Sequence, residues 1–167
     1  MSSLPSVASS SHRDSSGVRT AARAIIVRND ELLVVRIKSE EGEFLVLPGG
    51  GQNHGETLHA TVVREVNEEL GLNVIVEDLA YVREYVGKNH SMHRIHGHFH
   101  QVETVFYCKC DNFESIGAGK GQDRRQVGFL WIPLSKIDQH PISPPGLSKI
   151  ITQKTKGGAA RYLGDVH

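Results

Sequence analysis

The sequence lacks cysteine pairs at useful spacing, an excess of charge of either sign, and long apolar runs. Among its 167 residues are two cysteines, and 19 Lys and Arg balance 19 Asp and Glu. Cys108 and Cys110 stand two positions apart in an extended pattern, which suits neither a disulfide framework nor a four-ligand zinc site, so we interpret them as small core residues. The balanced charge excludes a global basic field that would attract nucleic acid or an anionic membrane.

No stretch approaches the roughly 18 consecutive apolar residues of a membrane span, and the first thirty residues lack the pattern of a secretory signal. We therefore expect a soluble, cytoplasmic protein with no membrane partner and no nucleic-acid partner. Any anion that it binds must be held locally.

The chain is long enough for one hydrophobic core and too short for two sizeable domains. Residues 1–19 are predicted to be a Ser-rich tail, because eight of the first sixteen residues are Ser and few are large and apolar. Residues 20–167 are predicted to form a single domain that includes a C-terminal helix and tail.

Apolar periodicity predicts strands before and after one well-defined helix. Residues 57–70 contain no Gly or Pro, and apolar residues recur there at every fourth position until Gly71. A hairpin is predicted at Asn29-Asp30, and the triple glycine after Pro48 is predicted to be a tight loop. The other expected strands are 24–27, 32–35, 44–47, 79–86, 102–110 and 126–132, with a short helix at 134–138 and a terminal helix ending at Lys154. This order predicts an α/β fold with a mixed central sheet between helices.

The expected helix places three carboxylates on one face. With about 3.6 residues per turn, Glu68 and Glu69 fall within roughly 60 degrees of Glu65, on either side. Their mutual repulsion opposes helix formation, and a bound cation would offset it. Carboxylate oxygens favour Mg²⁺, Mn²⁺ or Ca²⁺, and Mg²⁺ commonly joins protein carboxylates to a substrate phosphate.

Two further residues strengthen the pattern. Glu56 lies at the expected helix start, where a carboxylate is favoured, and Arg64 is placed to tie the preceding loop to the acidic face. The glycines before the helix allow a backbone to approach a ligand closely, and they could add a carbonyl ligand.

The segment 50–72 resembles the Nudix box at every defined position. The matching positions are Gly50, Glu56, Arg64, Glu65, Val66, Glu68, Glu69, Gly71 and Leu72. The resemblance implies a Nudix-like α/β/α sandwich and a pyrophosphohydrolase, related to the MutT-like enzymes, that uses Mg²⁺ or Mn²⁺. The implied substrate is a small molecule, a nucleoside diphosphate linked to another group.

The resemblance also implies roles for individual residues. Glu65, Glu68 and Glu69 match the family's metal-binding glutamates, with the Gly49 carbonyl as a further ligand. Arg64, Glu56 and Gly50 match residues that orient the box.

The implied reaction is attack of water on phosphorus, carried by Glu65, Glu68 and Arg64. Glu65 or Glu68 is expected near the attacking water, and Glu114 and Asp123 are the alternatives from a later loop.

Several alternatives stay open at this level. The chain could be a Nudix-like sensor or interaction module that binds a nucleotide without cleaving it, although the intact glutamates argue against this. Isomerisation of an isoprenoid diphosphate would need an active-site cysteine, for which Cys108 and Cys110 are poor candidates. Five His between His90 and His100 offer no closed tetrahedral set and indicate a solvated or dimer-edge loop. The sequence fixes neither the substrate nor whether the chain is a monomer or a homodimer.

Overall fold

The computed structural model describes residues 17–40, 42–90, 97–117, 119–122, 124–154 and 159–166. The first sixteen residues of the expected tail lie outside this part of the chain, and Arg19, the last residue assigned to that tail, already begins the first strand. In chain order the elements are β1 (Arg19–Arg28), β2 (Glu31–Ser39), β3 (Gly42–Val46), β4 (Gly49–Gly51), α1 (Leu58–Leu70), β5 (Ile75–Val86), the 3-10 helix η1 (Gly87–Asn89), β6 (His100–Lys109), β7 (Gln126–Pro133), the 3-10 helix η2 (Leu134–Gln139), α3 (Leu147–Lys154) and β8 (Arg161–Asp165).

The predicted hairpin at the start of the sheet is confirmed. Asn29 and Asp30 connect β1 to β2, and both have positive φ, 50° and 59°. Two consecutive residues of this kind give the tight turn whose twist matches antiparallel strands. Arg28 therefore pairs with Glu31 directly across the turn.

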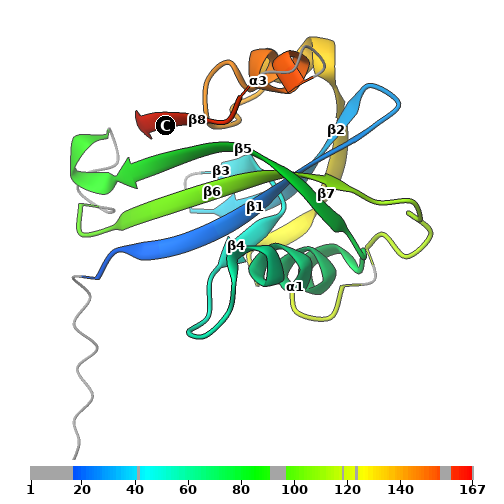
Figure 1. Ribbon diagram of the computed structural model, residues 1–167, viewed down its shortest axis with the longest axis horizontal. Helices are drawn as coiled ribbons and strands as arrows, with labels where there is room; N and C mark the ends of the chain where they lie inside the picture. The colour runs from blue at the N-terminus through cyan, green and yellow to red at the C-terminus, as the bar shows by residue number, and fades with distance from the viewer. Residues whose placement is uncertain are drawn as a thin grey trace, which may run out of the picture.

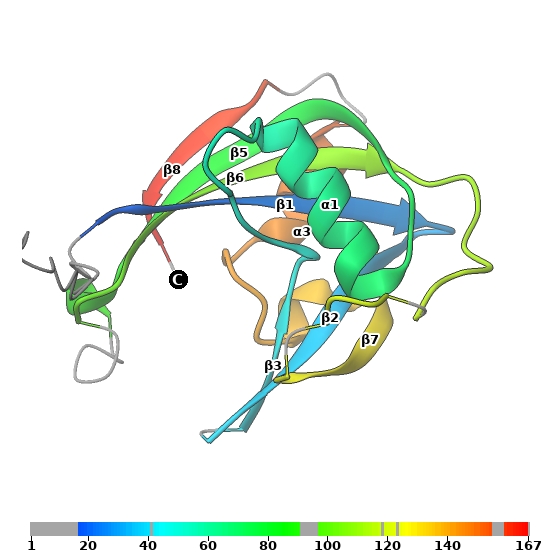
Figure 2. The ribbon, with the colours of Figure 1, turned by 90° about the horizontal axis from the view of Figure 1, so that it is seen from below.

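The strands form one mixed sheet in the order β3-β2-β1-β6-β5-β8, with β4 paired to β1 and β7 paired to β2. β1 runs parallel to β6, and the other pairings of β1 are antiparallel. Figure 1 shows α1 on one side of this sheet and α3 on the other, and Figure 2 shows α1 crossing the strands. The predicted α/β/α sandwich with a mixed sheet is confirmed.

Each face of the sheet has its own hydrophobic core. Val62, Val66 and Leu70 of α1 are fully buried against alternate residues of β1 and β6, including Ala24 and Phe106. Burial of each such large side chain contributes about 1.5–3 kcal/mol. On the other face, Ile25, Val105 and Tyr107 pack with Leu147 and Ile151 of α3. Because side chains alternate along a strand, β1 and β6 serve both cores at once.

The structure corrects the expectation for the triple glycine. Gly49–Gly51 is not a loop but the short strand β4, which pairs with Ala21–Arg23 of β1. Several bounds also differ: β1 begins at Arg19 rather than at residue 24, β5 begins at Ile75 rather than at residue 79, and Cys110 follows β6 rather than belonging to it. The strand β8, which pairs with β5, was not expected.

Candidate active site

The helix that carries the acidic residues has well-defined ends. Thr57 is its N-cap, and its hydroxyl accepts a hydrogen bond from the amide of Ala60 at 3.1 Å. Gly71 ends the helix in the left-handed conformation, and its amide bonds to the Asn67 carbonyl. These caps fix the register of α1, and so they fix which residues face the glycine strand β4.

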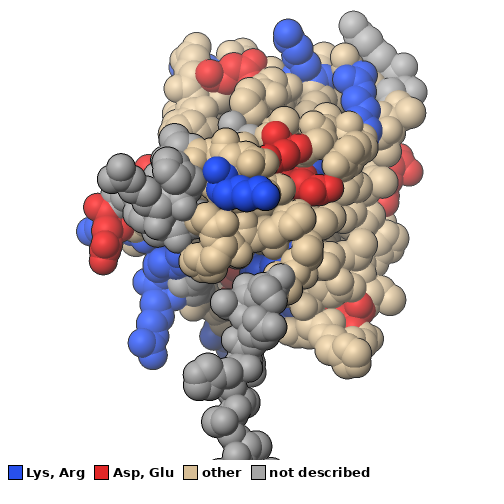
Figure 3. Space-filling model, turned by 90° about the vertical axis from the view of Figure 1, so that its left-hand side faces the viewer, with Lys and Arg blue, Asp and Glu red and all other residues tan. Residues whose placement is uncertain are grey.

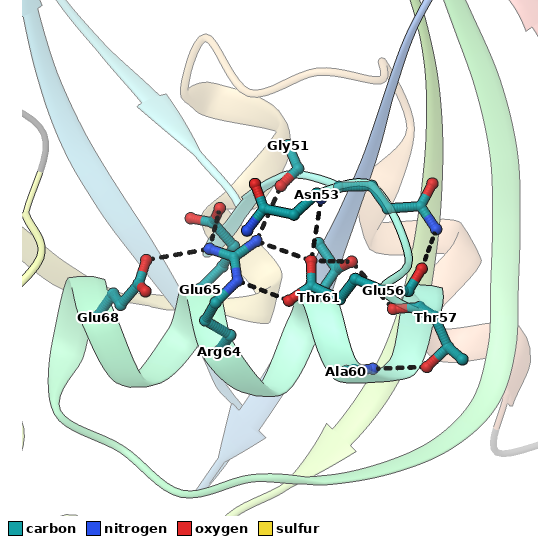
Figure 4. Close-up of polar contacts among 10 residues, drawn as sticks. Gly51, Asn53, Glu56, Thr57, Ala60, Thr61, Arg64, Glu65 and Glu68 are labelled. Atoms are coloured by element: carbon teal, nitrogen blue, oxygen red, sulfur yellow. Dashed lines mark hydrogen bonds and ion pairs between the residues drawn. The ribbon is translucent and has the colours of Figure 1, made fainter.

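Arg64 is the centre of the hydrogen-bond network at this helix (Figure 4). Its guanidinium donates to both carboxylate oxygens of Glu56, at 2.7 and 3.0 Å, and to the Gly51 carbonyl at 2.9 Å. The remaining nitrogen, Nη1, donates to Glu65 at 2.8 Å and to Glu68 at 3.0 Å. A planar guanidinium suits this task because its five donors point in fixed directions. The expected link from the loop to the acidic face is present.

This network changes the ionisation of its members. The hydrogen bond from Arg64, together with that from the Asn53 amide, lowers the pKa of Glu56 to about 2. The pKa of Arg64 is raised, chiefly by its hydrogen bonds to Glu56 and then, against the opposing effect of burial, by Glu65. Both groups are charged at neutral pH, and Arg64 offsets part of the repulsion between the carboxylates.

Glu65 and Glu69 both approach β4, but at different glycines. The buried Glu69 accepts a hydrogen bond from the Gly49 amide at 2.9 Å. The Glu65 carboxylate lies so close to Gly50 that a Cβ atom there would be 2.5 Å from the carboxyl carbon. Glu68 is more accessible, with 42% of its side chain exposed against 17% for Glu65. The structure therefore brings two of the three expected metal-binding glutamates to β4 and links the third to Glu65 through Arg64.

The carbonyl of Gly49, the expected backbone ligand, accepts a hydrogen bond from Arg23 Nη1 at 3.1 Å. Arg23 forms an ion pair of 2.6 Å with Glu103, which also pairs with Arg83 at 2.8 Å. Glu103 is not among the site residues expected from the sequence. Its signal was a charged residue within an otherwise apolar strand, because such a residue is either buried with a partner or unfavourable.

The loop after β6 caps the C-terminal end of α1. The Gly117 amide donates to the Leu70 carbonyl at 2.9 Å, and the Gly121 amide donates to the Glu68 carbonyl at 3.0 Å. Glu114 is exposed in this loop, and its amide is held by Asn112 at 2.8 Å. The structure does not bring Glu114 into the network of Arg64, and Asp123 lies outside the described residues.

The donor set fits a hard divalent cation. The carboxylates of Glu65, Glu68 and Glu69 and the Gly49 carbonyl are all oxygen donors, the type that Mg²⁺ and Mn²⁺ take. Two of these carboxylates meet β4, because Glu65 lies against Gly50 and Glu69 accepts a hydrogen bond from the Gly49 amide. Within the residues that the structure describes, however, no three His, Cys, Asp or Glu side chains are already gathered around one point.

The histidine segment has structural partners where it is described. His90 pairs with Asp165 of β8 at 2.6 Å, and His100 pairs with Glu84 at 3.1 Å. The first contact joins the segment to the C-terminal strand β8 and the second joins it to β5, and neither involves a residue of α1. His93 and His96 lie outside the described residues.

Cys108 is buried in the core beneath α1, as expected. On the face drawn in Figure 3, Lys and Arg side chains alternate with Asp and Glu side chains and form no large patch of one sign. No helix in the described residues is long and apolar enough to cross a membrane.

A family model described as the NUDIX domain matches residues 18–153. Among the solved structures that share the fold, three illustrate the low sequence identity. A NUDIX hydrolase from Nitrosomonas europaea has a TM-score of 0.67 at 20% identity, covering 86% of this chain and 93% of that one. An ADP-ribose pyrophosphatase from Streptococcus suis has a TM-score of 0.61 at 18% identity, covering 87% of this chain and 99% of that one.

A MutT NUDIX hydrolase from Burkholderia pseudomallei has a TM-score of 0.57 at 23% identity, covering 80% of this chain and 95% of that one. No curated protein matches the chain. The family model spans most of the chain and includes β4 and α1, where the network of Arg64 lies. The chain therefore belongs to the NUDIX domain family, that of the Nudix hydrolases.

Proposed function

We propose that this Nudix protein is a divalent-cation-dependent hydrolase that cleaves a phosphoanhydride bond in a nucleoside diphosphate linked to another group. The observation that carries the proposal is the arrangement of Glu65, Glu68 and Glu69 around Arg64 and the glycine strand β4. Similarity to proteins described as an ADP-ribose pyrophosphatase and as MutT supports this class of substrate.

The charge balance supports a cation at this position. Three carboxylates, those of Glu56, Glu65 and Glu68, surround one guanidinium, that of Arg64, and Glu69 adds a fourth carboxylate at the Gly49 amide. The excess of negative charge would repel an anionic substrate unless a cation reduced it. Glu65, Glu68, Glu69 and the Gly49 carbonyl would hold Mg²⁺ or Mn²⁺. When bound, that ion would neutralise charge on the phosphate oxygens and lower the pKa of water.

The side chains have separate tasks in this proposal. Glu68 is the most accessible of the three glutamates, so it is best placed to accept a proton from the attacking water. Arg64 holds Glu65 and Glu68 in orientation and is itself held by Glu56. Glu69 fixes the Gly49 peptide by accepting a hydrogen bond from the Gly49 amide.

The test is a mass-spectrometric screen of nucleotide sugars, dinucleotides, oxidised nucleoside triphosphates and capped RNA. Each is incubated with the protein in Mg²⁺, in Mn²⁺, or in EDTA. We expect release of a nucleoside monophosphate or inorganic pyrophosphate that requires the cation. Binding of a nucleotide measured by calorimetry without any product would instead support a sensor and overturn the proposal.

Variants then locate the reaction. Glu68→Gln should lower turnover by about 100-fold or more, because it removes the proton acceptor while keeping the side-chain shape. Glu43→Gln is the matched control, since Glu43 is an exposed residue of β3 that pairs with Arg36 of β2. If Glu68→Gln retains wild-type turnover while Glu114→Gln loses it, the proton acceptor lies in the loop after β6 instead.

A further inference from the structure

The ion pair between Glu103 and Arg23 lies directly behind the glycine strand. Glu103 is 2% exposed, and its Oε2 accepts a hydrogen bond from Arg23 Nε at 2.6 Å. A second nitrogen of the same guanidinium, Arg23 Nη1, donates to the carbonyls of Leu47, at 2.8 Å, and Gly49, at 3.1 Å. One buried carboxylate thus holds the side chain that orients two carbonyls.

Gly49 is held by charged side chains at both of its polar groups. Its amide donates to Glu69 and its carbonyl accepts from Arg23. Its φ of +134° and its position against Ala22, whose carbonyl oxygen would lie 2.3 Å from a Cβ, leave room for glycine alone. The direction of the Gly49 carbonyl therefore depends on where Arg23 is held.

We propose that Glu103 is a positioning residue that acts through Arg23 on the Gly49 carbonyl and so increases the affinity of the site for its divalent cation. This inference rests on the proposed function, in which that carbonyl is a ligand. A carbonyl oxygen has two lone pairs, so one can accept from Arg23 while the other faces the cation.

The physical reason for a carboxylate here is charge. A guanidinium bonded to a metal ligand would repel a divalent ion, and the repulsion is strong in a buried, weakly polarisable environment. Glu103 neutralises Arg23 on the side away from the carbonyl. Partners of metal ligands commonly contribute 10- to 100-fold in metal affinity.

Glu103 has a second partner that provides a matched control. Arg83 on β5 pairs with the other carboxylate oxygen at 2.8 Å and donates to the Val166 carbonyl at 3.0 Å, away from the glycine strand. Arg83→Gln removes an ion pair from the same buried carboxylate, but it leaves the pair between Glu103 and Arg23 in place. If the role of Glu103 were purely structural, losing its ion pair with Arg83 and losing its ion pair with Arg23 would weaken metal binding equally.

The experiment measures Mn²⁺ affinity by electron paramagnetic resonance in the full chain, with circular dichroism as the check on folding. We expect Glu103→Gln to weaken Mn²⁺ binding by about 10- to 100-fold. Arg83→Gln should stay within about twofold of the wild type. Hydrogen exchange at the Gly49 amide should accelerate in Glu103→Gln and not in Arg83→Gln, because only the first change frees the Gly49 peptide.

The outcomes separate this inference from the proposed function. Wild-type protein that binds no Mn²⁺ and cleaves no substrate overturns the proposed function and this inference with it. Wild-type protein that does both, together with unchanged Mn²⁺ affinity in Glu103→Gln or equal losses in Glu103→Gln and Arg83→Gln, overturns the inference alone.

A second variant covers the case in which Glu103→Gln does not fold. Arg23→Lys keeps the positive charge, but a single ammonium group cannot reach both the carboxylate and the two carbonyls. It should also weaken Mn²⁺ binding by about 10-fold or more. Wild-type affinity in Arg23→Lys overturns the inference.

Discussion

Replacing Gly50 with Ala tests whether the position of Glu65 matters for turnover. A Cβ atom at Gly50 would lie 2.5 Å from the Glu65 carboxyl carbon and from its Oε2. Ordinary contact needs roughly 3.5 Å, so the carboxylate must move by about 1 Å or more. It is the far end of a flexible side chain, so it can move while the backbone stays in place. The displacement would loosen the hydrogen bond of 2.8 Å from Arg64 to Glu65.

Stability and turnover should therefore respond very differently in Gly50→Ala. Overpacking costs about 1 kcal/mol at the lower end, and the loss of a glycine from the unfolded chain offsets up to about 1 kcal/mol of that. A displacement of this size at a reacting group costs about 100-fold in rate. Urea unfolding and turnover, measured on the same preparation, should show stability within about 1 kcal/mol of the wild type and turnover reduced by about 100-fold.

Two other glycines calibrate this result. Gly49→Ala places a Cβ 2.3 Å from the Ala22 carbonyl oxygen, which is backbone and cannot turn away, so it should lose about 3 kcal/mol or more of stability. Gly146→Ala meets nothing within 4 Å but has a φ of +76°, so it should lose about 1 kcal/mol with normal turnover. Wild-type turnover in a folded Gly50→Ala protein would refute the argument that Glu65 must lie against β4.

Three further predictions concern the same helix and the ion pair behind it. Arg64→Lys keeps the charge but loses the planar donors, so it should reduce stability by about 1–2 kcal/mol in urea unfolding and turnover by about 10-fold or more. Thr57→Ala removes the N-cap hydroxyl of α1 and should cost about 1 kcal/mol in the same unfolding assay, with wild-type KM for the substrate.

The third prediction concerns the stability of the protein at acidic pH. Burial opposes ionisation of Glu103, but the charges of Arg23 and Arg83 lower its pKa to about 2 from the ordinary 4.5. Because the folded pKa is the lower one, the stabilisation is complete above pH 4.5 and is lost as the pH falls towards 2, by an amount on the order of 3 kcal/mol. Urea unfolding from pH 6 to pH 2 should show a shallower fall in Glu103→Gln than in the wild type. Equal slopes would contradict the assignment.

Local sequence patterns predicted the elements whose backbone hydrogen bonds are local. Leu58, Val62, Val66 and Leu70 recur at every fourth position. This spacing predicts α1, because a helix that packs against a sheet needs one apolar face. The hairpin at residues 29–30 was predictable for a similar reason, since its two-residue turn is determined by its own backbone. β8 was missed because its pairing with β5 joins residues about 80 positions apart. Its five residues contain only one aliphatic side chain, that of Leu163, so no periodicity marked them.

The contacts of the candidate site are also of two kinds, those between residues close in the sequence and those between distant strands. The contacts of Glu56, Arg64 and Glu65 lie within one helix and the loop before it, and the spacing of these residues was enough to predict their association. The contacts of Arg23 and Glu103 connect strands 80 residues apart, through the parallel pairing of β1 and β6. A sequence without that register cannot distinguish an internal ion pair from two unrelated surface charges.

The triple glycine differs from its expected local structure, yet it lies against the glutamates of α1. A tight loop was expected there, yet β4 is a strand with three pairings to β1. The absence of side chains matters there because β4 lies between β1 and α1. A Cβ at Gly49 would meet β1, and one at Gly50 would meet Glu65 of α1. Close approach, rather than freedom of the backbone, lets the glutamates of α1 reach a strand that is itself fixed by the sheet.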